Sequence, residues 1–229
     1  MYRVGLFKKL LSFFWPIVIE KREGKLGHQL EVIVYNGKTM FDTAEVNYSF
    51  GKLHEVMHQV LMRLKKKNYS FEQVLILGYG GGSAAKIIHE EILNEAQIVG
   101  VEMDEEVIDL AKKYFYTKEV KLLQEDAFQY VKKAIDKGWK YNVIVIDIFK
   151  NADIPPYSEA FFEQIYSLLE DNGVAMLNTM CDETSFKKIG EKIGQAGFQK
   201  DFWNEMKENR VWIFKPYAKF GATTKSLVP

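Results

Sequence analysis

The feature that most constrains this chain is a series of short apolar runs separated by segments with helical spacing. The apolar runs are QVLILG, QIVGVE, VKLL, YNVIVID and GVAMLN, which end at Gly78, Glu102, Leu123, Asp147 and Asn178. The helical segments lie near residues 84–94, 105–115, 127–137, 158–170 and 183–196. Near-continuous apolar strands that alternate with helices predict a parallel sheet covered by helices on both faces.

The end of the chain departs from this alternation. FQKDFW and RVWIF follow one another with only a polar turn between them, so they predict an antiparallel pair at the edge of the sheet. Five parallel strands and this pair make an α/β fold with a doubly wound, mostly parallel, seven-stranded sheet.

The first part of the chain has a different pattern, which predicts a small antiparallel β unit. Strands are expected at 16–21, 31–35 and 38–42, and Asn36-Gly37 between the last two is a strong hairpin signal because both residues tolerate positive φ. An amphipathic helix over 50–64 then leads into the core. We therefore expect a β unit over residues 1–48 and a ligand-binding domain over 49–229.

Charge and cysteine content narrow the class of partner. The 229 residues include 31 basic and 31 acidic ones, so no overall field draws the chain to nucleic acid or to a membrane. A small-molecule partner is favoured instead. The single cysteine, Cys181, forms no internal disulfide, which fits a reducing cytoplasm.

The opening segment, LFKKLLSFFWPIVIEK, faintly resembles a secretory signal. It has no A-x-A-like cleavage site, and Pro16 and Glu20 bound the apolar run well short of a membrane span. We expect a short helix followed by the first strand. Aromatic residues such as Phe13, Phe14 and Trp15 are expected in the core or in contacts between copies, because no basic stripe accompanies them.

A glycine-rich loop directly follows the first strand of the main sheet. In G-Y-G-G-G-S, the glycines Gly78, Gly80 and Gly82 let the backbone turn tightly around Tyr79 and let a ligand approach the main chain. The loop predicts a nucleoside site. A nicotinamide dinucleotide stays open as an alternative, although Ser83 stands where G-x-G-x-x-G requires its third glycine.

Acidic residues end or follow the next strands. Glu102, beside Met103, ends the second strand, where a carboxylate can accept hydrogen bonds from both ribose hydroxyls. Asp126 could bind an adenine amino group while the N–H of Ala127 binds a ring nitrogen, although a helix N-cap explains Asp126 equally well. Asp147 ends the fourth strand. Because these strands end at one edge of the sheet, the acids are expected to form one site.

The stretches VLILGYGGG, VGVEMDEEVIDLAKKYF, VKLLQEDAFQYV, YNVIVID and PYSEAFFEQIYSLLEDNGV resemble the spermidine synthases, or aminopropyltransferases, over roughly residues 40–215. The resemblance implies the Rossmann-like methyltransferase fold and a cofactor that is S-adenosylmethionine or its decarboxylated form. It also implies that the glycine loop and Glu102 hold this cofactor, that Asp126 reads adenine and that Asp147 lies near the attacking amine. Tyr48 stands where these proteins place substrate-facing residues.

Two positions depart from the family pattern. Gly81 replaces the aspartate of the family's G-G-G-D-G-G loop, and Lys150 replaces the second aspartate of D-x-x-D-P. Aminopropyl transfer needs carboxylates to bind cationic amines and to accept a proton. We therefore expect methyl transfer to a small molecule, with Asp147 and Tyr48 as the catalytic residues. True aminopropyl transfer and a non-catalytic nucleoside-binding protein remain as alternatives.

Two further motifs are assigned lesser roles. His54 and His58 match H-E-x-x-H, but the sequence shows no third ligand, so no metal site is expected. The segment Asp153–Tyr157 resembles the D-P-P-Y box of methyltransferases that act on amines, and is better explained as a proline-stiffened loop before a helix. Tyr157 is expected near the acceptor. The lead-in helix and the β unit are compatible with a homodimer.

Overall fold

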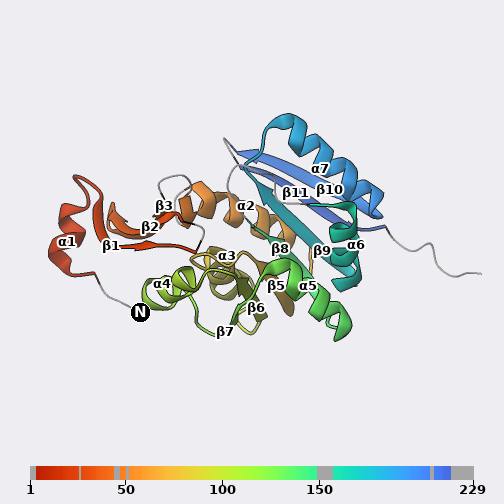
Figure 1. Cartoon of the computed structure of the whole chain (residues 1–229), viewed down its shortest axis with the longest axis horizontal. Coiled ribbons are helices and arrows are strands. Elements are labelled where there is room, and N and C mark those ends of the chain that lie inside the picture. The colour runs from red at the N-terminus through yellow and green to blue at the C-terminus, as the bar shows by residue number, and fades with distance from the viewer. Residues whose placement is uncertain are drawn as a thin grey trace, which may run out of the picture.

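The computed structural model describes residues 4–25, 27–43, 47–49, 52–148, 157–206 and 209–217. Figure 1 shows an elongated molecule in which a small sheet lies at one end and a large sheet with its helices forms the rest. In the part of the chain that the structure describes, no helix combines the length and the apolarity needed to cross a bilayer.

The large sheet has seven strands in the order β10-β11-β9-β8-β5-β6-β7. Its strands are β5 (Gln73–Leu77), β6 (Gln97–Glu102), β7 (Val120–Gln124), β8 (Tyr141–Ile146), β9 (Leu169–Thr179), β10 (Phe198–Met206) and β11 (Asn209–Pro216). Strands β5 to β9 run parallel, and β11 pairs antiparallel with both β9 and β10. The predicted doubly wound α/β sheet with an edge hairpin is confirmed.

Helices cover both faces of this sheet. They are α2 (Lys52–Lys66), α3 (Ser83–Ile87), α4 (Glu105–Tyr114), α5 (Ala127–Asp136), α6 (Glu159–Leu168) and α7 (Glu183–Gln195). Alternate side chains of β8 lie on opposite faces of the sheet. Val143 and Val145 pack with α2 and α3, whereas Ile144 and Ile146 pack with α5, α6 and α7. Burial on both faces explains why the strands are apolar throughout.

The helix expected at 84–94 is interrupted. α3 ends at Ile87, and a π-helix, η1 (Ile88–Ile92), follows with a hydrogen bond from Leu93 N to the Ile88 carbonyl at 2.8 Å. The wider turn accompanies a buried His89, whose Nε2 lies 2.8 Å from the Ala96 carbonyl oxygen. The apolar spacing of this segment is compatible with either helix type, so the sequence did not indicate the change.

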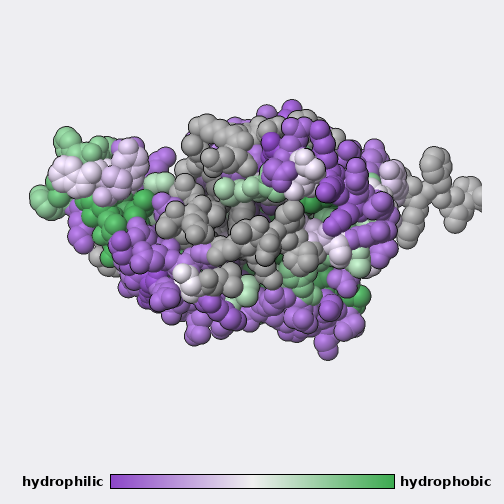
Figure 2. All heavy atoms as spheres, turned by 45° about the horizontal axis from the view of Figure 1, so that its top comes forward, coloured by the Kyte–Doolittle hydropathy of each residue, from purple (hydrophilic) through white to green (hydrophobic). Residues whose placement is uncertain are grey.

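The small sheet has the order β1-β2-β3-β4, with β1 (Ile17–Glu23), β2 (Gln29–Tyr35), β3 (Lys38–Thr43) and β4 (Asn47–Ser49). Asn36 and Gly37 have φ of 49° and 72°, which confirms the predicted hairpin turn. Helix α1 (Leu6–Leu11) precedes β1, as expected. Figure 2 shows hydrophobic residues gathered at this end of the molecule. The boundary at residue 48 stays a prediction, and β4 lies across it.

Helix α4 joins the two sheets. Leu30, Val32 and Phe41 of the small sheet pack against Val107 and Leu110 of α4 in one buried cluster. An ionic network between β1 and α4 adds to this apolar contact. The small sheet is therefore docked on the main domain by α4.

The ionic network centres on Glu20 and Arg22 of β1. Arg22 binds Glu20 and Glu106 at 2.7 Å, while Glu20 also accepts from Lys113 at 2.6 Å and from the Tyr114 hydroxyl. The bonds from Lys113, Tyr114 and Arg22 lower the pKa of Glu20 to about 2. Three of these partners, Glu106, Lys113 and Tyr114, belong to α4.

We predict that Glu20→Gln weakens this docking, because the neutral amide loses the ionic part of the contacts with Lys113 and Arg22. The free energy of unfolding should fall by about 1 to 2 kcal/mol at pH 7. Because the folded-state pKa is lowered, the wild-type advantage is fully present above pH 4.5, the ordinary pKa of glutamate, and is lost as the pH falls toward 2. Urea denaturation of both proteins across this pH range measures it.

Glu31→Gln is the matched control. Glu31 lies on β2 of the same sheet and pairs only with a more exposed lysine, Lys21, among the ion pairs of the described residues. Its loss should cost less than about 0.5 kcal/mol. Equal effects of the two substitutions would contradict the assignment of docking to Glu20.

Candidate functional site

A cleft lies at the carboxyl ends of β5, β6, β7 and β8. It is lined by His28, Leu30, Gly78, Gly80, Val101, Glu102, Met103, Asp104, Glu125, Asp126, Ala127, Phe128, Asp147 and Ile148. Strands β5 and β8 are neighbours, and the chain leaves them toward opposite edges of the sheet. This is the switch point at which open α/β sheets bind ligands.

The glycine loop after β5 forms the back of the cleft. Gly78, Gly80 and Gly82 all have positive φ, at 83°, 53° and 76°. A Cβ on Gly78 would collide with the Asp147 carbonyl, and one on Gly82 would collide with the Tyr116 carbonyl. The loop can therefore take this path only with glycine at these positions, as the sequence predicted.

Two of the predicted cofactor residues lie outside the cleft lining. The Tyr79 side chain is buried, packs against Gly100 of β6 and donates its hydroxyl to the Tyr116 carbonyl at 2.5 Å. Gly82 caps the N-terminus of α3 and packs against the same tyrosine. Both residues shape the loop from behind.

The carboxylate of Glu102 holds the loop, β6 and the start of α4 together. Its Oε2 accepts from Gly80 N at 3.1 Å, and its Oε1 accepts from Met103 N at 2.9 Å and from Asp104 N at 3.2 Å. The side chain is buried, and burial raises its pKa while the three backbone donors oppose this rise. A carboxylate at this place can also accept from ligand hydroxyls at the cleft.

Asp126 is both a helix cap and a cleft residue. Its Oδ1 accepts from Phe128 N at 3.0 Å and from Gln129 N at 3.1 Å, so the N-cap interpretation is correct. Both bonds end on Oδ1, which leaves Oδ2 to accept from a ligand. Ala127 lies beside it in the lining. The adenine role and the capping role are therefore compatible.

Asp147 lies at the end of β8 and is half-buried. Its Oδ1 accepts from Asn178 Nδ2 at 2.9 Å. Burial raises the pKa of Asp147 to about 7, the nearby charge of Glu102 adds to this rise, and the bond from Asn178 opposes it. A carboxyl with such a pKa can exchange a proton near neutral pH.

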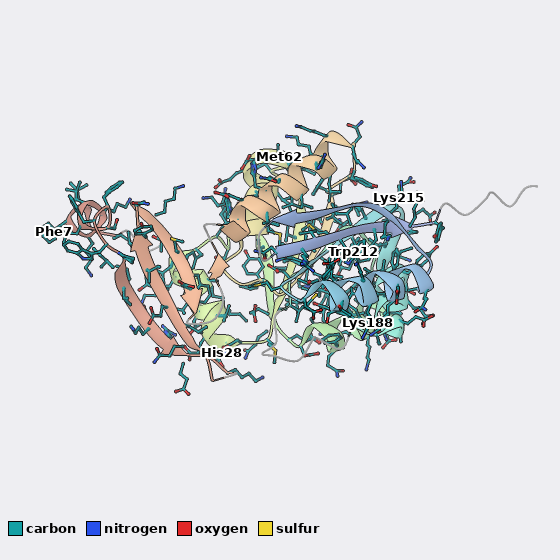
Figure 3. The ribbon with its side chains drawn as sticks, turned by 90° about the horizontal axis from the view of Figure 1, so that it is seen from above. Phe7, His28, Met62, Lys188, Trp212 and Lys215 are labelled. Carbon is teal, nitrogen blue, oxygen red and sulfur yellow. The ribbon has the colours of Figure 1, made fainter. Side chains whose placement is uncertain are left out.

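Sequence reasoning missed the contribution of the small sheet. His28 and Leu30 of this sheet form one wall of the cleft, and Figure 3 shows His28 where the small sheet meets the main domain. The loop before β2 is fixed by Asp104, whose Oδ2 accepts from Lys25 N at 2.7 Å. No local pattern signals this wall, because it depends on how two separately folded sheets pack.

Several other lining residues were not singled out in the sequence. Asp104, Glu125, Phe128 and Ile148 each lie within two residues of a predicted site residue, so the carboxyl edge of the sheet was the available signal. Lys150 and Asp153 lie outside the described residues, as does the side chain of Tyr48. Tyr157 is described, and its hydroxyl donates to the Ile148 carbonyl at 3.2 Å at the border of the cleft.

The charged residues that line the cleft are predominantly acidic. Five lining residues are acidic, namely Glu102, Asp104, Glu125, Asp126 and Asp147. Among the described lining residues none is lysine or arginine, and His28 is the sole residue with a basic side chain. Such a cleft favours cationic ligands over anionic ones.

The H-E-x-x-H motif lies on α2, away from the cleft. His54 and His58 are one turn apart with ring centroids 6.4 Å from each other, and His58 Nε2 is 2.8 Å from Glu91 Oε2 on η1. Within the described ranges, no group of three or more histidine, cysteine or acidic side chains could hold a metal ion.

Comparison with protein families gives a match that covers more than half of the chain. The model of the family described as "Spermine/spermidine synthase domain" matches residues 51–203. This span includes α2 and the strands β5 to β9, and with them every described cleft residue except His28 and Leu30.

Curated relatives carry one recurrent name. A polyamine aminopropyltransferase of Vibrio vulnificus is 34% identical over 113 residues, which cover 47% of this chain and 38% of the relative. One of Pyrobaculum islandicum is 33% identical over 155 residues, which cover 61% of this chain and 51% of the relative. The chain thus spans about half or less of the length of these relatives.

Solved structures share the fold. Spermidine synthase from Thermotoga maritima matches with a TM-score of 0.58 at 19% identity. The match covers 86% of this chain and 72% of the synthase chain. Human methyltransferase-like protein 13, solved in complex with SAH, has a TM-score of 0.63 at 20% identity over 76% of this chain and 86% of its own. The predicted Rossmann-like methyltransferase fold is confirmed.

The expectation of methyl transfer is wrong. The family match and the relatives named polyamine aminopropyltransferase point to aminopropyl transfer instead. The expectation gave too much weight to Gly81 and Lys150, two positions at which the family acid is missing. The cleft is acidic without them, because Asp104 and Glu125 add to the three predicted carboxylates.

We predict that Asn178→Ala raises the pKa of Asp147 beyond its value of about 7, because the amide donor that favours the charged carboxylate is removed. Carbon-13 NMR of the aspartate carboxyls, with Asp147→Asn to assign the signal, measures the shift. Asn142→Ala is the control, since Asn142 accepts from Gln73 N at the opposite end of β8 and should leave the pKa of Asp147 unchanged. A constant pKa in Asn178→Ala would contradict the role of the amide.

Proposed function

The chain belongs to the spermine/spermidine synthase domain family, and from this membership and the chemistry of its cleft we propose that it transfers an aminopropyl group from decarboxylated S-adenosylmethionine to a small amine. The observation that carries the proposal is the cleft lining of five acids without lysine or arginine among its described residues.

This charge distribution favours the decarboxylated cofactor over the intact one. Intact S-adenosylmethionine carries an α-carboxylate, which the ionised acids of the lining repel. The decarboxylated compound carries a sulfonium and an ammonium group and no carboxylate, so all of its charges are attracted. The amine acceptor is also a cation near neutral pH and gains from the same field.

The residues present fit an adenosyl group. Gly78 and Gly80 line the cleft without side chains, which lets a ligand lie close to the backbone. In the proposal, Glu102 binds the ribose hydroxyls, while Asp126 and the N–H of Ala127 bind adenine. Glu102 lies at the end of β6, and Asp126 follows the end of the neighbouring strand β7. Ribose and adenine, which are adjacent in the cofactor, would thus be bound at adjacent strands.

Asp147 is proposed to bind and deprotonate the acceptor amine. The cofactor supplies a sulfonium whose neighbouring carbon is open to attack by nitrogen, so that a C–N bond forms as the C–S bond breaks. The attacking nitrogen must lose one proton, and the carboxylate of Asp147, with its pKa of about 7, can take it. Asn178 keeps this carboxylate oriented through its 2.9 Å hydrogen bond.

The direct test is calorimetric titration followed by a turnover assay. We expect decarboxylated S-adenosylmethionine to bind at least about tenfold more tightly than S-adenosylmethionine, which corresponds to about 1.4 kcal/mol. Diamines should then yield aminopropylated products, detected by mass spectrometry. Tighter binding of intact S-adenosylmethionine or of NAD, or binding without turnover on any amine, would overturn the proposal.

Glu102→Gln should weaken binding of decarboxylated S-adenosylmethionine by about 1.5 to 3 kcal/mol, the range for hydrogen bonds to a charged group. Calorimetry measures the loss. Glu125→Gln is the comparison, because Glu125 also lines the cleft but pairs with Lys133 at 2.9 Å. Equal losses would mean that general charge, and not a specific bond to the ribose, accounts for the effect.

The pH dependence tests the role of Asp147. Because burial raises its pKa to about 7, the carboxylate is protonated below this pH and cannot accept the proton of the amine. The rate at saturating cofactor should therefore rise as the pH increases through about 7. In Asp147→Asn this inflection should disappear and the rate should fall at least about 100-fold. An unchanged inflection in the variant would assign it to another group.

A cytoplasmic location is proposed from the state of the one cysteine. Cys181 is a free thiol that lies 3.0 Å from Thr179 Oγ1, which is compatible with the proposed reducing cytoplasm. The expected homodimer stays a prediction, which sedimentation of the purified chain decides.

A further inference from the structure

A second cavity lies at the opposite end of the large sheet from the cleft. It is lined by residues at the amino ends of β5, β6, β7 and β8, by Tyr130 of α5 and by Trp139 of the turn that follows α5. Its volume of about 570 Å³ is in the range of about 300 to 1,000 Å³ that small-molecule sites have. Along β8, Asp147 lies six residues beyond Tyr141, which is about 20 Å in a strand. The cavity is therefore separate from the cleft.

The position of this cavity follows from the connection between β7 and β8. In the order β8-β5-β6-β7, helix α5 must pass two strands on its way from the end of β7 to the start of β8. The cavity lies beside the C-terminal end of α5, over the amino ends of β6 and β7. Val99 of β6 packs against the cluster that contains Tyr130, and Lys121 is its partner in register on β7. Both side chains thus lie on the α5 face and form the floor of the cavity.

Trp139 supplies an aromatic wall. It follows Gly138, whose φ is 67°, and its N–H donates to the Ala134 carbonyl at 3.0 Å, so the turn after α5 holds it in place. Its ring packs against Tyr130 with the two ring centroids 6.1 Å apart, and its side chain is still 38% exposed. A tryptophan held in this way offers an open ring surface to another aromatic group.

The charge around the cavity is opposite in sign to that of the cleft. The charged lining residues are Glu95, Glu119, Lys121 and Lys140. Lys118 pairs with Glu119 at 3.2 Å, so three ammonium groups stand against two carboxylates. The Lys121 side chain has no acidic partner among the described residues, and its Nζ lies 5.8 Å from the centroid of the Trp139 ring. A ring that packs on Trp139 therefore lies beside a positive charge, which favours an anion over a cation.

Two buried hydroxyl groups in the lining need an acceptor. The side chains of Tyr130 and Tyr141 are buried, and their hydroxyl oxygens lie 2.7 Å apart. Burial raises the pKa of both tyrosines, so both hydroxyls keep their protons near neutral pH. One proton forms the bond between the two oxygens, and the other has no acceptor in the part of the chain that the structure describes. A buried donor of this kind is satisfied by an oxygen atom of a ligand or of water.

We propose that this cavity binds a small aromatic anion, whose ring packs on Trp139 and whose carboxylate or phosphate accepts from Lys121 and from the tyrosine pair. Lys121 and Tyr130 both adjoin the Trp139 ring, so a single ligand can reach both. Such a ligand is not a substrate of the proposed transfer, because the length of the strands separates it from Asp147. The inference uses no residue of the cleft and does not depend on the proposed function.

The test is NMR of the nitrogen-15-labelled full chain, in which the indole N–H of each of the four tryptophans gives a signal and W139F assigns that of Trp139. Three compounds with one ring system but different charge are titrated: indole-3-acetate, indole-3-acetamide and tryptamine. We expect indole-3-acetate to shift the Trp139 signal and to bind at least about tenfold more tightly than the neutral amide, with tryptamine the weakest. Tighter binding of tryptamine at this signal, or no shift by any of the three at about 10 mM, would overturn the proposal.

The lysine is tested by K121A, which should weaken binding of indole-3-acetate about tenfold because a charged partner of the ligand is lost. K118A is the matched control, since Lys118 lies three residues away, pairs with Glu119 and is outside the lining. Its affinity should stay within about twofold of the wild type. Equal losses in the two variants would mean that general charge attracts the ligand, and would overturn the site.

The hydroxyl pair is tested by Y130F/Y141F, which removes both donors and keeps both rings. It should weaken binding about fivefold or more, whereas Y130F or Y141F alone leaves one hydroxyl whose proton can reach the ligand and should retain most of the affinity. Wild-type affinity in the double variant would contradict the assignment. Turnover in the cleft should be the same in K121A as in the wild type, and the titration needs no turnover, so failure of the proposed reaction and failure of this inference are distinguishable.

Discussion

The buried carboxylate of Glu102 is the interaction on which the site depends. It accepts three backbone N–H groups, from Gly80 in the glycine loop and from Met103 and Asp104 at the start of α4. An acid removed from water is stable only when its oxygens are satisfied in this way. One side chain therefore sets the distance between the loop and the neighbouring strand, and the cleft exists because that distance is fixed.

The acidity of the cleft follows from the fold as much as from chemistry. Asp104 and Asp126 are N-caps of α4 and α5, a role for which aspartate is favoured at the end of a strand in any α/β sheet. Because both caps lie at the same edge as Glu102 and Asp147, structural acids add to the field felt by a ligand. The absence of two family acids thus changes the charge of the cleft less than a position-by-position comparison suggests.

The fold was largely predictable because its signals are local. Strand ends, the Asn36-Gly37 turn and the capping acids can each be identified within a few residues, and the structure has them as expected. His28 was not predictable, since its place in the cleft results from packing between Leu30, Phe41 and Leu110, which are distant in sequence. The buried position of Tyr79 behind the loop was equally hidden, because it depends on the space left by Gly100 on the next strand. The π-helix after α3 has no sequence signal at all.

Helix α4 has a double role that links the two ends of the molecule thermodynamically. Its first residues adjoin the cleft through the cap Asp104, and its outer face carries the small sheet, whose His28 closes the cleft. A ligand that touches His28 binds the docked arrangement more tightly than a displaced one, and so must stabilise it. By reciprocity, whatever holds the small sheet in place raises the affinity of the cleft by the same factor. Occupancy of the cleft and the resistance of the N-terminal segment to proteolysis therefore both report the equilibrium between the docked and the displaced small sheet.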